Sequence, residues 1–150
     1  MREFFIGLWE NRILMAAVIA WAIAQFLKTV IYISVYREWR SDRLWGSGGM
    51  PSSHAATVCA LTVSALTHYG PASPVFAICF ILAAVVLHDA HGVRLEAGKH
   101  AAILTAVTDI LKKTHKGEIP EMELKELVGH TPLQVAVGSV IGIIVGLLIK

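Results

Sequence analysis

The chain has 150 residues, of which 55% are hydrophobic and 16% are charged, and its mean hydropathy is +0.63. This composition is too apolar for an ordinary soluble protein, so residues 1–150 are expected to form a single membrane-embedded domain. The formal net charge of +2 is too small to indicate a nucleic-acid partner, and the basic residues are expected to face membrane lipid instead.

The N-terminal stretch MREFFIGLWENR does not resemble a signal peptide, because the apolar run after it is too long and lacks a small-residue cleavage site. It is interpreted as an interfacial segment. The first predicted span is residues 13–36, whose one charged residue is Lys28, and it is long enough to cross a bilayer as a helix. Lys28 lies about two helical turns before the end of this span, so its ammonium can snorkel to the membrane surface or face a ligand there.

The stretch GSGGMPSSHAA leads into the second predicted span, residues 54–69. Ser52 and Ser53 can cap this helix, and Gly48 and Gly49 allow the backbone to turn its amides toward a ligand. A proline in the first turn with a serine cap is also an ordinary way to begin a helix, so these residues do not by themselves indicate a site.

The breaker-rich turn GPASP at residues 70–74 leads into the third predicted span, residues 74–90, so the second and third spans form an antiparallel hairpin. A polar insert follows over residues 91–131. It contains an amphipathic helix over 97–113, expected at the membrane surface, and a short helix over 121–128.

The last predicted span is residues 132–149, in which Gly138, Gly142 and Gly146 form a ridge that lets another helix approach closely. Packing within the chain is the expected use of this ridge, and a homodimer contact is the alternative. The predicted fold class is therefore all-α: an integral membrane helical bundle of about four transmembrane helices with an amphipathic helical insert.

Alternation through four spans places residues 37–53 and 91–131 on one side of the membrane. Nine of the thirteen Lys and Arg residues fall there, three fall on the other side, and Lys28 lies within a span. The positive-inside rule then makes this side, with the insert, cytoplasmic in a multi-pass protein of the cell membrane. An additional crossing in the N-terminal segment would invert this orientation.

Two histidines, His54 and His130, stand at the starts of the second and fourth spans, on the predicted cytoplasmic side. Helix N-termini favour anions, and histidine within a membrane helix is costly unless it faces water or a polar partner. Across a phosphate, one neutral imidazole could attack phosphorus while the other protonates the departing alkoxide, with Lys28, Arg43 and Arg94 neutralising the oxygens. This scheme uses neither a metal nor a cofactor.

A metal site formed by His54, His88, Asp89 and His91 is a weaker alternative. His88 and His91 are three residues apart and lie near one face of a helix, but Gly92 indicates that the helix is already ending.

The segments GGMPSSHAA, DAHGVRLEAGKHAA and KELVGHTPLQVAVGSVIG resemble the divergent branch of the type 2 phosphatidic acid phosphatase family, which is related by fold to the vanadium haloperoxidases. The resemblance covers most of the chain from Lys28 onward. Pro51-Ser52-Ser53-His54 is similar to the family's Pro-Ser-Gly-His motif, which supplies the acid. His130-Thr131-Pro132-Leu133-Gln134 with Gly138 is similar to its His-x-Pro-x-Asp-x-x-x-Gly motif, which supplies the nucleophile.

The resemblance implies a membrane phosphohydrolase that acts on a lipid or prenyl phosphate through a phosphohistidine intermediate. The implied catalytic residues are His130, His54 and Asp89. The implied phosphate-binding residues are Lys28, Arg43, Gly49, Ser52, Ser53 and Arg94.

The chain departs from the family pattern at several positions. Gln134 stands where the family has the aspartate that orients the nucleophilic histidine, and Leu124 stands where it has a phosphate-binding arginine. Arg94 is the candidate to replace that arginine, and Asp89 either supplies the missing carboxylate or pairs with Arg94. Lys28 lacks the following Arg-Pro of its motif. The alternative function is therefore a catalytically inactive membrane protein of the same fold that binds a phosphate, a lipid head group or a protein partner.

Overall fold

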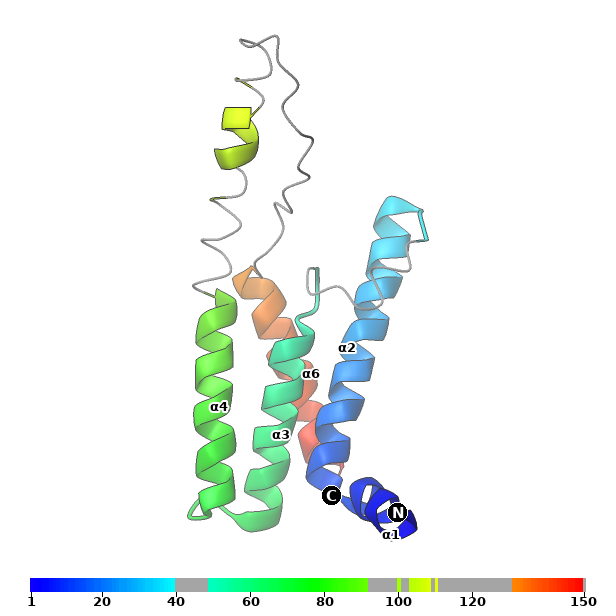
Figure 1. The fold of residues 1–150 in the computed structure, drawn as a ribbon, viewed down its shortest axis with the longest axis vertical. Helices are drawn as coiled ribbons and strands as arrows, with labels where there is room; N and C mark the ends of the chain where they lie inside the picture. The colour runs from blue at the N-terminus through cyan, green and yellow to red at the C-terminus, as the bar shows by residue number, and fades with distance from the viewer. Residues whose placement is uncertain (40–48, 92–99, 101–102, 109, 111–130, 150) are drawn as a thin grey trace.

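The structure is a computed structural model, and it describes residues 1–39, 49–91, 100, 103–108, 110 and 131–149. Every regular element in these residues is a helix, which confirms the predicted all-α class (Figure 1). The labelled helices are α1 (Arg2–Glu10), α2 (Arg12–Tyr36), α3 (Ser53–Tyr69), α4 (Pro74–His91) and α6 (Pro132–Leu148).

Helices α2, α3, α4 and α6 occupy the four predicted apolar ranges and begin or end within about one residue of them. Local chemistry fixes these boundaries. The Asn11 side chain accepts a hydrogen bond from the N–H of Leu14 at 3.0 Å at the start of α2. Gly70, with φ +77°, ends α3, and Pro74 opens α4 on the far side of the predicted turn.

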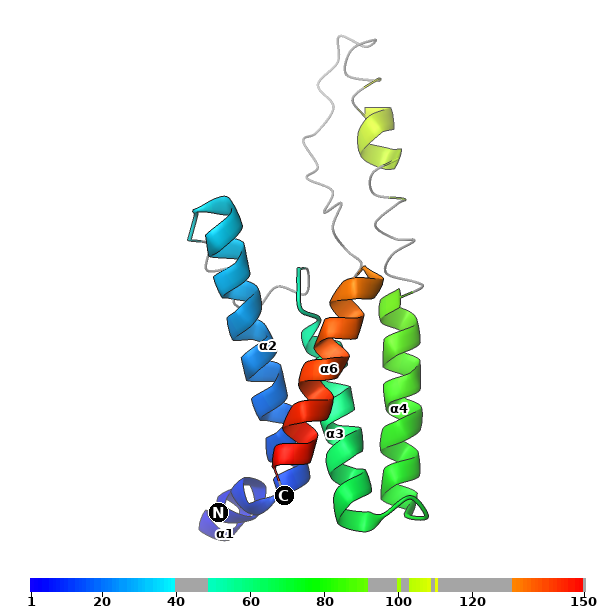
Figure 2. The same cartoon turned by 180° about the vertical axis from the view of Figure 1, so that it is seen from behind.

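Helix α3 is the centre of the bundle, because α2, α4 and α6 all pack against it. Successive helices of the four run in opposite directions (Figures 1 and 2). The ends of α2 and α4 and the starts of α3 and α6 therefore lie at one end of the bundle. The turn between α3 and α4, the helix α1 and the C-terminal end of α6 lie at the other end.

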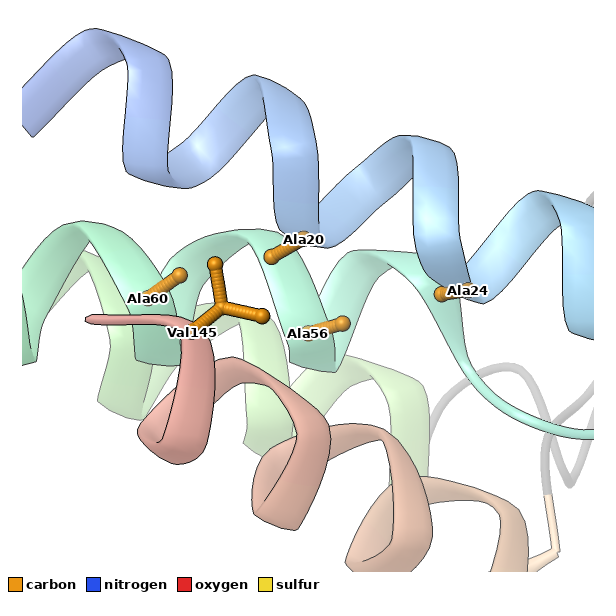
Figure 3. Close-up of a cluster of buried hydrophobic side chains, with 5 residues drawn as sticks. All are labelled: Ala20, Ala24, Ala56, Ala60 and Val145. Atoms are coloured by element: carbon orange, nitrogen blue, oxygen red, sulfur yellow. The ribbon is translucent and has the colours of Figure 1, made fainter. Parts of the chain in front are cut away.

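Small side chains make up most of the interior of the bundle. Alanines of α2 and α3 surround Val145 of α6, which points between them (Figure 3). Among the described residues, the largest side chains that are fully buried are those of Pro51, Ser52 and Ser64. The helix backbones therefore approach one another closely, as they do in helical membrane proteins. The core cluster of Figure 3 is Ala20, Ala24, Ala56, Ala60 and Val145.

The three glycines of α6 pack directly against α3. A Cβ atom added at Gly138 would collide with the carbonyl oxygen of Ser52, and one added at Gly142 would lie 2.8 Å from Cys59 Cβ. One added at Gly146 would lie 2.8 Å from the Ala60 carbonyl oxygen. The expected packing within the chain is thus confirmed. A homodimer remains a prediction, and it would have to use another face because α3 covers these glycines.

Large apolar side chains lie on the outside of the bundle. Helix α2 is the one described helix whose length and hydropathy suffice for a membrane span, whereas α4 and α6 are apolar but shorter. That all four helices cross a membrane therefore remains a prediction. Large apolar residues exposed on these helices include Val18, Phe26 and Val30 of α2, Ile78, Ile81 and Val85 of α4, and Val140, Ile144 and Leu148 of α6.

The N-terminal segment forms α1, a helix with no buried residue that lies beside the start of α2 at one end of the bundle (Figures 1 and 2). Phe4, Phe5 and Trp9 are each more than half exposed. A groove of about 650 Å³ between α1, the first turns of α2 and Ile149 includes Trp9 in its lining.

Part of the predicted polar insert is described. Residues 103–108 are helical and fall within the amphipathic helix expected over 97–113. The helix expected over 121–128 lies outside the described residues.

Candidate functional site

Buried polar side chains gather where the second half of α2 meets the start of α3. Six polar residues of the described part of the chain are buried, and five of them belong to this region. The sixth, Ser64, lies further along α3. The five are Gln25, Lys28, Thr29, Ser52 and Ser53.

The side chain of Lys28 is only 3% exposed. Its ammonium donates hydrogen bonds to Gln25 Oε1 at 2.8 Å and to Ser53 Oγ at 3.4 Å. The snorkelling interpretation of Lys28 is therefore wrong, because the charged group is held inside the bundle by oxygen atoms of α2 and α3. A buried ammonium in an apolar helix is costly, which makes this the position in α2 that most needs a functional explanation.

Gly49 lies against the aliphatic part of Lys28. Its φ of +98° is a conformation that favours glycine, and a Cβ atom there would lie 3.4 Å from Lys28 Cγ. The turn before α3 thus brings its backbone onto the lysine stem. Pro51, whose peptide bond with Met50 is cis, is fully buried just beyond this turn.

Ser52 and Ser53 have different roles, although both were candidate caps. Ser52 Oγ accepts a hydrogen bond from the N–H of Ala55 at 3.3 Å, so Ser52 is the N-cap of α3. Ser53 is the first residue of the helix, and its Oγ accepts from Lys28. The cap prediction is confirmed for Ser52, whereas Ser53 connects the start of α3 to the charged group.

The first turns of α3 and α6 are bonded to each other. The N–H of Ser52 donates to the carbonyl oxygen of Gln134 at 3.0 Å. Both helices begin at the same end of the bundle (Figures 1 and 2), so the positive ends of their dipoles lie close together, and Ser53 in the first turn of α3 bonds to Lys28. The predicted meeting of these two helix N-termini is confirmed.

The side chain of Gln134 closes the first turn of α6. Its Oε1 accepts a hydrogen bond from the N–H of Thr131 at 3.1 Å, and Thr131 Oγ1 accepts from the N–H of Gln134 at 3.4 Å. These two bonds form a capping box. Gln134, which by the resemblance stands where the family has an aspartate, therefore stabilises the start of α6, a role that was not predicted. The Thr-x-x-Gln spacing was the sequence signal for it.

Gln25 and Thr29 were missed as candidates. Thr29 Oγ1 donates to the Gln25 carbonyl oxygen at 2.9 Å, and the Gln25 side chain accepts from Lys28. A signal was present, because residues three or four apart share a helix face and polar residues inside an apolar span mark a functional face.

The remaining candidates are only partly described. His54 is the second residue of α3 and Asp89 lies in the last turn of α4, so both stand at the site end of the bundle and both are partly exposed. His130, Arg43 and Arg94 lie outside the described residues, and their roles remain predictions. Within the described residues there is no group of three His, Cys, Asp or Glu that could hold a metal ion.

Comparison with known proteins gives two matches that together cover nearly all of the chain. The model of the Divergent PAP2 family matches residues 9–145. The "Uncharacterized membrane protein YuiD" of Bacillus subtilis (strain 168) is 33% identical over 153 residues, which are 95% of this chain and 96% of the relative. No solved structure matches the chain significantly.

Proposed function

The chain belongs to the Divergent PAP2 family, and we propose that it is a multi-pass membrane phosphohydrolase of a lipid or prenyl phosphate, with its site at the cytoplasmic face. Four observations or arguments support this proposal: the surface of the bundle, the buried lysine, the paired helix starts and the two histidines.

The distribution of side-chain size supports a membrane location. A soluble bundle buries its large apolar residues, whereas this one buries alanine and glycine and exposes Phe26 at 68%, Ile78 at 68% and Leu148 at 75%. Lipid would cover such a surface, and small residues between helices are typical of membrane bundles. The name of the Bacillus relative, a membrane protein, agrees with this reasoning.

The buried ammonium of Lys28 beside the starts of α3 and α6 is the single observation that carries the proposal. It donates to Ser53 in the first turn of α3, and α3 is bonded to the first turn of α6 through Ser52 and Gln134. A cation and two helix N-termini at one place favour an anion, and in this family the expected anion is a phosphate ester.

The proposed reaction has two steps. An imidazole nitrogen of His130 attacks phosphorus, the bond from phosphorus to the alkoxide oxygen breaks, and His54 gives that oxygen a proton. Water then attacks the phosphohistidine and gives a proton to His54, the phosphorus–nitrogen bond breaks, and inorganic phosphate is released with both histidines restored. Lys28, with Arg43 and Arg94, stabilises the charge on the phosphoryl oxygens in both steps.

The test is release of inorganic phosphate by the purified protein from phosphatidate, phosphatidylglycerophosphate or a prenyl diphosphate. We expect His130→Ala to abolish release and His54→Ala to slow it by about 10²- to 10⁴-fold. His68→Ala is the matched control, because His68 lies in the last turn of α3 at the opposite end of the bundle. A parent protein that releases no phosphate from any of these substrates would refute the hydrolase.

A second candidate function is favoured by Gln134. A neutral amide already engaged in a capping box cannot stabilise an imidazolium as an aspartate does. The protein would then be a phosphate or head-group receptor, or a partner-binding subunit, that has kept the pocket without the reaction. Binding of vanadate or phosphate without phosphate release, in the same assays, identifies this second function.

A further inference from the structure

Gln25 is the neutral partner of a buried cation. The Gln25 side chain is 8% exposed, and its amide oxygen lies 2.8 Å from the Lys28 ammonium, one helical turn further along the same helix. Thr29 Oγ1 bonds to the backbone carbonyl of Gln25 rather than to its side chain. The geometry thus leaves the amide of Gln25 directed at the lysine.

The chemical nature of this partner decides what Lys28 can do. A glutamate at position 25 would have nearly the same size and reach, and it would accept the same hydrogen bond. It would also cancel the positive charge, so that an incoming anion would have to compete with a carboxylate. An amide oxygen satisfies one N–H of the ammonium and adds no negative charge beside it.

The second described acceptor of the ammonium has the same property. Ser53 Oγ is neutral, and it lies in the first turn of α3, 3.4 Å from Lys28 Nζ. Gln25 of α2 and Ser53 of α3 therefore hold the ammonium at the first turn of α3. Gly49 lies against the lysine stem and limits the space in which the side chain can move.

We propose that Gln25 is a positioning residue that holds the Lys28 ammonium at the first turn of α3 through a neutral acceptor, so that position 25 adds no negative charge to compete with an anionic phosphate group. This inference rests on the phosphate binding of the proposed function, but it does not depend on catalytic turnover.

The experiment compares Gln25→Glu, Gln25→Met and Ser34→Ala with the parent protein in detergent micelles. Inorganic phosphate and vanadate are titrated, and the dissociation constant is obtained from the shift in thermal unfolding. Gln25→Glu keeps the hydrogen bond and adds a negative charge beside the ammonium, and Gln25→Met removes the bond without adding charge. Ser34→Ala is the control on the same helix, because Ser34 is exposed and its hydroxyl donates to the Val30 carbonyl outside the site.

We expect Gln25→Glu to unfold at or above the temperature of the parent in the absence of ligand and to bind phosphate at least tenfold more weakly. Gln25→Met should bind about threefold to tenfold more weakly, because the ammonium is no longer held in place. Ser34→Ala should stay within twofold of the parent. A purely structural role for Gln25 would instead leave the phosphate affinity of a folded Gln25→Glu unchanged.

The inference is overturned if Gln25→Glu binds phosphate within twofold of the parent, or if the parent binds neither anion. Should Gln25→Glu not fold, Gln25→Met decides, and affinity within twofold of the parent overturns the inference. A parent that binds phosphate but releases none from any ester refutes the hydrolase alone and leaves the positioning role supported.

Discussion

Lys28 is the residue on which stability and function make opposite demands. Burying an ammonium costs free energy that is only partly recovered by hydrogen bonds to Gln25 and Ser53. A methionine has a similar length and would fill the same apolar surroundings without that cost. If the side chain at position 28 served packing alone, a lysine would therefore give no more stability than a methionine.

This reasoning predicts that Lys28→Met leaves the free energy of unfolding unchanged or raises it by about 1–4 kcal/mol, while phosphate affinity falls at least tenfold. Thermal unfolding of the protein without ligand and phosphate titration on the same samples measure the two effects. A variant that is clearly less stable but binds phosphate normally would show that Lys28 serves the structure.

At the scale of elements, the contact between α3 and α6 positions the site. The glycines of α6 bring its backbone against α3, and this contact includes the Ser52 carbonyl next to the site. Any side chain inserted between the two helices would separate their first turns and move the helix N-termini apart. The packing of glycines far from the site is thus coupled to its geometry.

Gly142→Ala should destabilise the protein by about 1–3 kcal/mol, because the new methyl group would collide with the Ala56 carbonyl and lie 2.8 Å from Cys59 Cβ. Gly7→Ala is the matched control. It is also a helical glycine, but no atom lies within 4 Å of its added Cβ, so the change should be neutral or stabilising by about 1 kcal/mol. Unfolding temperatures of the two variants test this, and equal effects would contradict the packing described for α6.

At the scale of the whole molecule, orientation in the membrane follows from the distribution of charge. The end of α2 and the start of α3 lie at one end of the bundle, and the turn between α3 and α4 lies at the other (Figure 1). Nine Lys and Arg residues belong to segments that follow α2 and α4, so the site end is proposed to face the cytoplasm.

The orientation predicts how single cysteines react in intact cells, in a background in which Cys59 and Cys79 are replaced by alanine. Ala72→Cys, in the turn between α3 and α4, should react with a membrane-impermeant thiol reagent. Glu38→Cys, just after α2, should react only after the cells are opened. The reverse pattern would indicate an inverted protein, and labelling of both in intact cells would rule out a bundle that crosses the bilayer.

The apolar helices were predictable because hydropathy and breakers set their limits, as Gly70 and Pro74 do between α3 and α4. The start of α3 was predictable because the cap chemistry of Ser52 is local. The burial of Lys28 was not predictable, because a run of apolar residues does not reveal which face of a helix packs against a neighbouring helix. Gln25 was overlooked although it lies three residues before Lys28, a spacing that places both on one helix face. That this face meets the start of α3 could not be read from the sequence.

The position of α1 at one end of the bundle has a consequence for how deep Lys28 would lie in a membrane. If its aromatic side chains rest at one boundary of the hydrocarbon layer, Lys28 stands sixteen residues above Arg12, which is about 24 Å along a straight helix. The hydrocarbon layer is about 30 Å thick, so the ammonium would lie several ångströms below the opposite boundary. The phosphate of a lipid substrate could reach the ammonium only if it moved below the level of the other head groups or if the hydrocarbon layer became thinner at this place. Access to the site would therefore depend on bilayer thickness.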